Sequence, residues 1–119
     1  MKKFKIEKLN TVDIGSLLTS YSGALFKDTN GALTSFFVNK ISDGKIVYDY
    51  EIRYGANHHC KIFEIRLLDL MGSISMEVQY LNDTETFYIK DSELENTIDE
   101  IISSDRMGRF LGYLISINS

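Results

Sequence analysis

The sequence predicts an α+β fold in which an antiparallel meander of about six β-strands is covered on one face by helices. Two patterns predict it: short runs of alternating apolar and polar residues joined by brief turns, and amphipathic helical stripes near both ends of the chain. The expected order is β-α-β-β-β-β-β-α-α. The 119 residues are 44% apolar and 25% charged and contain no proline or linker, so we expect a single domain over residues 1–119.

The N-terminal part is predicted to form a short strand and then a helix. Phe4 and Ile6 alternate with lysines, which indicates a strand with one wet face. Asn10 or Thr11 is the expected N-cap of the helix that follows. Between residues 12 and 26 the apolar side chains recur at helical spacing, at Ile14, Leu17, Leu18, Tyr21 and Leu25.

A β-hairpin is predicted after the turn at Asn30-Gly31. Residues 36–41 and 46–54 are rich in β-forming residues and flank Asp43-Gly44, a pair typical of tight hairpin turns. One face of the second strand is expected to be apolar and consists of Ile46, Tyr48, Tyr50, Ile52 and Tyr54. The other face is expected to be largely solvated and consists of Val47, Asp49, Glu51 and Arg53.

Three further strands and two helices complete the prediction. Residues 61–70, 73–81 and 86–90 are joined by short turns, which favours an antiparallel meander. Ser92 and Glu95 have the spacing of a capping box, so a helix should begin there, and residues 103–105 should cap a second one. The two apolar stripes are Leu94, Ile98, Ile101 and Ile102, and Met107, Phe110, Leu111, Leu114 and Ile115.

The sequence carries none of the common catalytic or phosphate-binding motifs, so we expect no enzymatic activity, no catalytic residue and no cofactor. His58-His59-Cys60 is the one cluster of metal-capable side chains. Neighbours on a strand point to opposite faces, so we interpret it as a polar turn entering a strand, and not as a metal site or a thiol catalyst. Asp49 and Glu51 lie beside Arg53 and are interpreted as a salt-bridged, solvated face.

Charge is distributed unevenly along the chain. Residues 83–105 hold eight acids and one base, a net charge of −7, whereas the other 96 residues carry +3. Such a surface repels nucleic acid and anionic membranes but attracts a basic protein. Three of the acids complement a helix dipole. The alternative to partner binding is an ordinary solvated helix face. The acidic candidates for partner binding are Asp83, Glu85, Glu95, Asp99, Glu100 and Asp105.

Tyrosines give a second indication of partner binding. Tyr48, Tyr50 and Tyr54 share one strand face, and tyrosine is favoured at protein interfaces. The alternative is that this face packs under helices. We also expect a cytoplasmic location with a reduced Cys60, because no secretory signal and no run of about 20 apolar residues occurs.

The C-terminal third, from Thr84-Glu85-Thr86-Phe87-Tyr88-Ile89-Lys90-Asp91-Ser92-Glu93 into Ile101-Ile102-Ser103-Ser104-Asp105-Arg106, resembles small acidic bacterial immunity proteins of contact-dependent inhibition systems. The resemblance covers about a third of the chain and extends to size and strand layout. It implies a cytoplasmic inhibitor that binds one cognate toxin, often a basic nuclease, and covers its active site or another surface.

Two other classes remain open from the sequence. An acidic α+β secretion chaperone or adaptor would hold a segment of an effector. That class commonly opens with a helix, whereas this chain is predicted to open with a strand. An enzyme or small-ligand carrier would need convergent polar groups in a pocket between sheet and helices, and the sequence shows few. The sequence leaves the oligomeric state open.

Overall fold

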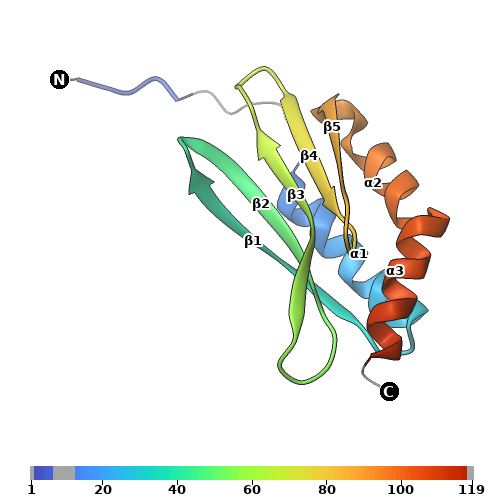
Figure 1. The fold of residues 1–119 in the computed structure, drawn as a ribbon. Coiled ribbons are helices and arrows are strands. Elements are labelled where there is room, and N and C mark those ends of the chain that lie inside the picture. The colour runs from blue at the N-terminus through green and yellow to red at the C-terminus, as the bar shows by residue number, and fades with distance from the viewer. Residues whose placement is uncertain (1, 7–12, 118–119) are drawn as a thin grey trace.

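The computed structural model describes residues 2–6 and 13–117 and contains one five-stranded antiparallel sheet with three α-helices on one face (Figure 1). Strands that follow each other in the chain are neighbours in the sheet, in the order β1-β2-β3-β4-β5. The elements are α1 (Ile14–Asp28), β1 (Thr34–Ser42), β2 (Lys45–Arg53), β3 (His59–Leu67), β4 (Ser73–Gln79), β5 (Thr84–Lys90), the 3₁₀ turn η1 (Asp91–Glu93), α2 (Leu94–Ile102) and α3 (Asp105–Ser116). The predicted α+β class and meander are confirmed, with five strands in the described residues instead of about six.

The strand predicted at Phe4 and Ile6 is wrong. Residues 2–6 belong to no strand, and these two side chains are 96% and 84% exposed. Alternation describes a segment that could line a sheet, but a strand forms only when its N–H and C=O groups find a partner strand. The predicted order therefore loses its first element.

Helix α1 begins at Ile14 because Asp13 caps it. The Asp13 carboxylate accepts hydrogen bonds from the backbone N–H of Ser16 at 3.1 Å and from its hydroxyl at 2.9 Å. Asn10 and Thr11, predicted for the N-cap, lie outside the described residues. The chain leaves the helix through the predicted turn at Asn30 and Gly31, whose φ angles of 53° and 80° are positive.

The predicted hairpin is confirmed. Asp43 and Gly44 have φ angles of 52° and 74°, and they join β1 and β2 with Ser42 opposite Lys45. Positive φ at both central residues gives a turn whose twist matches that of the flanking strands. The turn thereby sets the register of the β1–β2 pair.

The C-terminal helices begin differently from each other. The predicted capping box at Ser92 is wrong: the chain first forms η1, and the Glu93 carboxylate accepts the backbone N–H of Lys90 at 2.9 Å. Glu93 reaches this N–H group because the chain turns two residues earlier than the serine pattern suggests. The predicted cap of α3 is confirmed, since the Ser104 hydroxyl accepts the Met107 N–H at 3.1 Å.

A hydrophobic core fills the space between the sheet and the helices. Its fully buried members include Leu18 of α1, Phe63 and Ile65 of β3, Met76 of β4 and Ile98 of α2, each 0% exposed. The three helices α1, α2 and α3 thus pack onto one sheet face, and the other face is left without helices (Figure 1). Within the described residues, no helix is long and apolar enough to cross a membrane.

A β-bulge interrupts the alternation of β3. Tyr50 lies opposite Phe63, but the next residue, Glu51, lies opposite Lys61, so Ile62 is an extra residue. Ile62 and Phe63 are both buried as a result. The bulge also brings Lys61 and Glu64, three positions apart, onto the same open face of the sheet.

Candidate functional site

Helix α2 displays the acidic residues predicted to bind a partner. Leu94 and Ile98 are 0% exposed and fix one side of the helix against the core. The exposed part of the helix carries three carboxylates. We call Glu95, Asp99 and Glu100 the acidic α2 surface.

The charge of the acidic α2 surface is not neutralised locally. Helix α2 contains no basic residue, and among the described residues no Lys, Arg or His lies within 4.0 Å of these three carboxylates. Glu95 and Asp99 are four positions apart, a spacing at which like charges destabilise a helix by about 0.2–0.5 kcal/mol. The three charges therefore add to one negative field.

The positions of these three acids along α2 show which of them stabilise the helix. Glu95 lies in the first turn of α2, where the helix dipole favours a negative charge. Asp99 and Glu100 lie near the C-terminal end of the helix, where the dipole disfavours one. Helix stability thus accounts for Glu95 alone.

Asp99 has a second function as an anchor between helices. The Tyr21 hydroxyl of α1 donates a hydrogen bond to Asp99 Oδ1 at 2.7 Å. Burial raises the pKa of this hydroxyl, and the hydrogen bond to Asp99 and its charge raise it further, so Tyr21 stays a donor at neutral pH. Glu100 is the member of the acidic α2 surface that neither the dipole nor a hydrogen bond explains.

The remaining predicted acids lie apart from that surface. Asp83 and Glu85, beside and within β5, pair with Arg106 of α3, whose Nη1 is 3.7 Å from Glu85 Oε2. The Arg106 guanidinium also lies 3.8 Å from the centre of the Tyr80 ring. Asp105 is exposed in the first turn of α3, where it complements the dipole. The pairing with Arg106 reduces the field that Asp83 and Glu85 present to a partner.

The three tyrosines predicted as a contact surface lie on the helix-covered face. Tyr50 is 3% exposed, stacks on Phe63 with 4.8 Å between ring centres, and shares a 2.6 Å hydrogen bond with Ser35. It is a core residue and presents almost no surface. Tyr48 and Tyr54 are half-buried and also pack against the core. The alternative, a face packed under helices, describes this strand better.

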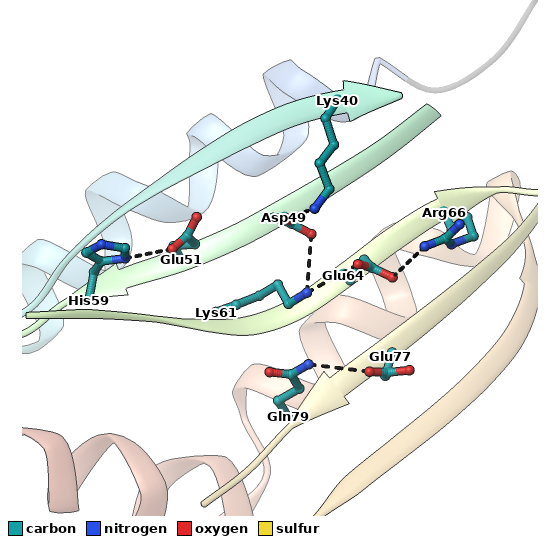
Figure 2. A network of polar contacts seen from close by, with 9 residues as sticks. All are labelled: Lys40, Asp49, Glu51, His59, Lys61, Glu64, Arg66, Glu77 and Gln79. Carbon is teal, nitrogen blue, oxygen red and sulfur yellow. Dashed lines mark hydrogen bonds and ion pairs between the residues drawn. The ribbon is translucent and has the colours of Figure 1, made fainter. Parts of the chain in front are cut away.

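The open face of the sheet carries an ion-pair network that the sequence did not predict in this form (Figure 2). Asp49 Oδ2 is 3.1 Å from Lys40 Nζ, and Asp49 Oδ1 is 3.6 Å from Lys61 Nζ. Glu64 continues the chain of contacts, 3.2 Å from Lys61 and 3.4 Å from Arg66. We call Lys40, Asp49, Lys61, Glu64 and Arg66 the open-face network.

The prediction that this face is largely solvated is right for exposed Arg53 and wrong for Val47 and Asp49. Val47 is 0% and Asp49 8% exposed. Lys40 and Arg66 are the cross-strand neighbours of Val47, and their charged ends reach Asp49 and Glu64. Long basic side chains in such positions can shield an apolar neighbour with their aliphatic stems. Every acid of the network lies beside a base, so its charges largely cancel.

Lys61 is the centre of the open-face network. Burial alone lowers the pKa of its amine, but the Glu64 hydrogen bond and the charges of Asp49 and Glu64 together outweigh burial and raise it. Lys61 therefore remains a cation at neutral pH. It holds the two carboxylates in place and is not poised as a base.

His58-His59-Cys60 does not converge on one point. His59 Nδ1 lies 2.8 Å from Glu51 Oε1 on the open face, whereas Cys60 packs against the core. His58 stacks on Tyr54, with 5.6 Å between ring centres. Burial and the Glu51 charge raise the pKa of the Cys60 thiol, which disfavours the nucleophilic thiolate. Within residues 2–6 and 13–117, no three His, Cys, Asp or Glu side chains gather in a metal-binding arrangement.

The structure also contains a cavity of about 610 Å³, at the end of the sheet where the β1–β2 turn, the β3–β4 loop, α1 and η1 meet. We call it the head cavity. Its apolar lining includes Ile14, Ile46 and Ile74, and these come from three separate elements. No local sequence pattern could have revealed it. Its carboxylates are Asp13, Asp69 and Asp91, and Lys45 is the basic side chain on the lining.

Comparisons with protein-family models, with curated proteins and with solved structures found no match to this chain.

Proposed function

We propose that this chain is an immunity-type inhibitor that binds one cognate bacterial toxin domain through the acidic α2 surface. The observation that carries the proposal is the presence of three exposed carboxylates on a firmly packed helix, with no base beside them in the described residues. A toxin that acts on nucleic acid needs Lys and Arg side chains to hold phosphates. Such a toxin is the natural electrostatic complement of this helix.

Two features of α2 support partner binding over simple solvation. The buried side chains Leu94, Ile98 and Ile101 hold the helix rigidly, so its carboxylates are already ordered before a partner arrives. Glu100 lies where a negative charge weakens the helix, so helix stability does not explain this acid. A negative field of this kind accelerates encounter with a basic protein.

Affinity capture from the native host tests the proposal. The wild-type chain and the Glu95→Lys/Glu100→Lys variant serve as baits, and Glu77→Lys on the open face serves as the control for altered charge. We expect the wild type and Glu77→Lys to retain a basic toxin domain and the double variant to lose it. The recovered toxin should lose its activity when an equal amount of the wild-type chain is added.

Two results would contradict the proposal. The first is a captured toxin domain that keeps full activity in the complex. The second is a secreted effector whose export depends on this chain, which would establish the chaperone function instead. Asp99 is left unchanged in the variant because its hydrogen bond to Tyr21 joins two helices.

A further inference from the structure

The head cavity combines an apolar interior with an acidic rim. Its volume of about 610 Å³ lies within the range of sites that enclose a small ligand or several side chains. Hydrogen bonds from Ser16 hold the pKa of Asp13 below its ordinary value, and the N–H groups of Met71 and Ser73 do the same for Asp69. Both carboxylates are therefore charged at neutral pH. The cavity suits an occupant that is apolar at its centre and basic at its edges.

Exposed apolar side chains surround the same end of the sheet. Leu70 and Met71 of the β3–β4 loop are 75% and 83% exposed, and Ile41 and Ile46 beside the β1–β2 turn are 77% and 46% exposed. Leu70 and Ile46 also line the head cavity. Large apolar groups gathered around a concavity mark an interaction site.

The N-terminal segment has the complementary chemistry. Residues 2–6 read Lys-Lys-Phe-Lys-Ile, and Phe4 and Ile6 are almost fully exposed. Six residues connect Ile6 to Asp13, which itself lines the cavity. A chain of that length spans at most about 20 Å, so residues 2–6 stay within reach of the cavity.

The structure shows residues Lys2–Ile6 outside the cavity, with Phe4 96% exposed. We propose that this segment also docks in the head cavity of its own chain. Phe4 enters the apolar interior beside Ile46 and Ile74, and the lysines face the carboxylates on the rim. Attachment to Asp13 through a short connection holds the segment near the cavity at an effective concentration in the millimolar range, about what a weak pentapeptide contact requires. The inference is independent of the partner proposed for α2.

Peptide binding provides the test, with a fluorescein-labelled synthetic peptide of residues 2–6 as the probe. A variant lacking residues 2–6 should bind the peptide, and the wild-type chain should bind it about tenfold or more weakly because its own segment competes. A peptide with alanine in place of Phe4, and one with glutamates in place of the lysines, should each bind poorly. Equal affinity of the wild type and the truncated chain would overturn the proposal, as would no binding to either.

Methyl NMR of the full chain gives a second readout that does not depend on truncation. Phe4→Ala changes an exposed side chain and should leave the fold intact, yet it should shift the methyl resonances of Ile46 and Ile74. Unchanged resonances would overturn the proposal. A wild-type dimer that the truncated variant does not form would show binding to a second copy, and the same-chain proposal would then be wrong.

Discussion

The open face of the sheet and the acidic α2 surface are both charged, but they organise charge in opposite ways. On the open face Asp49 lies 3.1 Å from Lys40, and Glu64 lies between two bases (Figure 2). On α2 the carboxylates of Glu95 and Glu100 have no base within 4.0 Å in the described residues. The number of charged residues on a surface therefore does not determine its electric field; the pairing of those residues does.

Pairing determines what each surface can do. The field of a close ion pair fades within a few ångströms, whereas like charges on one face act together out to the screening length of about 8–10 Å. The open-face network thus contributes to the pairing of β1, β2 and β3, whereas the field of the acidic α2 surface extends into the solvent around the helix. Four substitutions test this contrast through the free energy of unfolding, in order of decreasing expected effect.

Ile98→Ala should have the largest effect. Ile98 is 0% exposed, and truncating a buried isoleucine lowers the free energy of unfolding by about 2–5 kcal/mol. Hydrogen exchange should show α2 losing protection before β2 and β3, because the open-face network does not involve this helix. Uniform loss of protection would show that the two surfaces are not separable units.

Asp49→Ala should come next. It removes the acid between Lys40 and Lys61 and should lower the free energy of unfolding by about 1–3 kcal/mol, less than for a fully buried pair because both lysines are partly exposed. Glu51→Ala, on the same strand and face, is the matched control and should cost under about 1 kcal/mol. Equal urea midpoints for the two variants would contradict the structural importance of the network.

Gly44→Val should destabilise the hairpin that places Lys40 near Asp49. Gly44 has a φ of 74° and open space around it, so the penalty of about 1 kcal/mol or more comes from backbone strain and not from a clash. Gly23→Ala is the control. Gly23 is an exposed glycine of α1 with open space around it, so alanine there should raise the free energy of unfolding by about 0.5–1 kcal/mol. A urea midpoint that Gly44→Val leaves unchanged would argue against the tight turn.

Glu100→Lys should have the smallest effect, and in the opposite direction. A positive charge near the C-terminal end of α2 interacts favourably with the helix dipole, so the free energy of unfolding should rise by about 0.3–1 kcal/mol. A destabilised variant would mean that Glu100 makes a stabilising contact, and the argument that it serves a partner would lose its basis. Thermal unfolding at low ionic strength gives the clearest measurement.

Local patterns in the sequence predicted most of the fold. Alternation, the Asp43-Gly44 turn and the apolar stripes depend on neighbours in the chain, and they identified the five strands and three helices. The failures occurred where the outcome depends on distant partners. Phe4 and Ile6 alternate correctly but have no partner strand. Ser92 does not begin a helix because β5 stays paired with the distant β4 as far as Lys90, and Glu93 then accepts the Lys90 N–H.

The sites were harder to predict than the fold, for the same physical reason. The acidic α2 surface was visible in the sequence because one helix carries it. The open-face network depends on the bulge at Ile62, for which no glycine or turn residue gives a signal, and without it Lys61 and Glu64 would lie on opposite faces. The head cavity is assembled from four separate segments, so only the three-dimensional structure reveals it.

The central claim is that Glu95 and Glu100, which have no base within 4.0 Å among the described residues, guide a basic partner. The association rate tests it most directly. Stopped-flow binding of the captured toxin domain compares the wild type, Glu95→Lys/Glu100→Lys and the control Glu77→Lys at low and physiological ionic strength. The double variant should associate about tenfold or more slowly at low salt, with a smaller difference at physiological salt, and Glu77→Lys should match the wild type. Equal association rates for all three chains at both salt concentrations would contradict the claim.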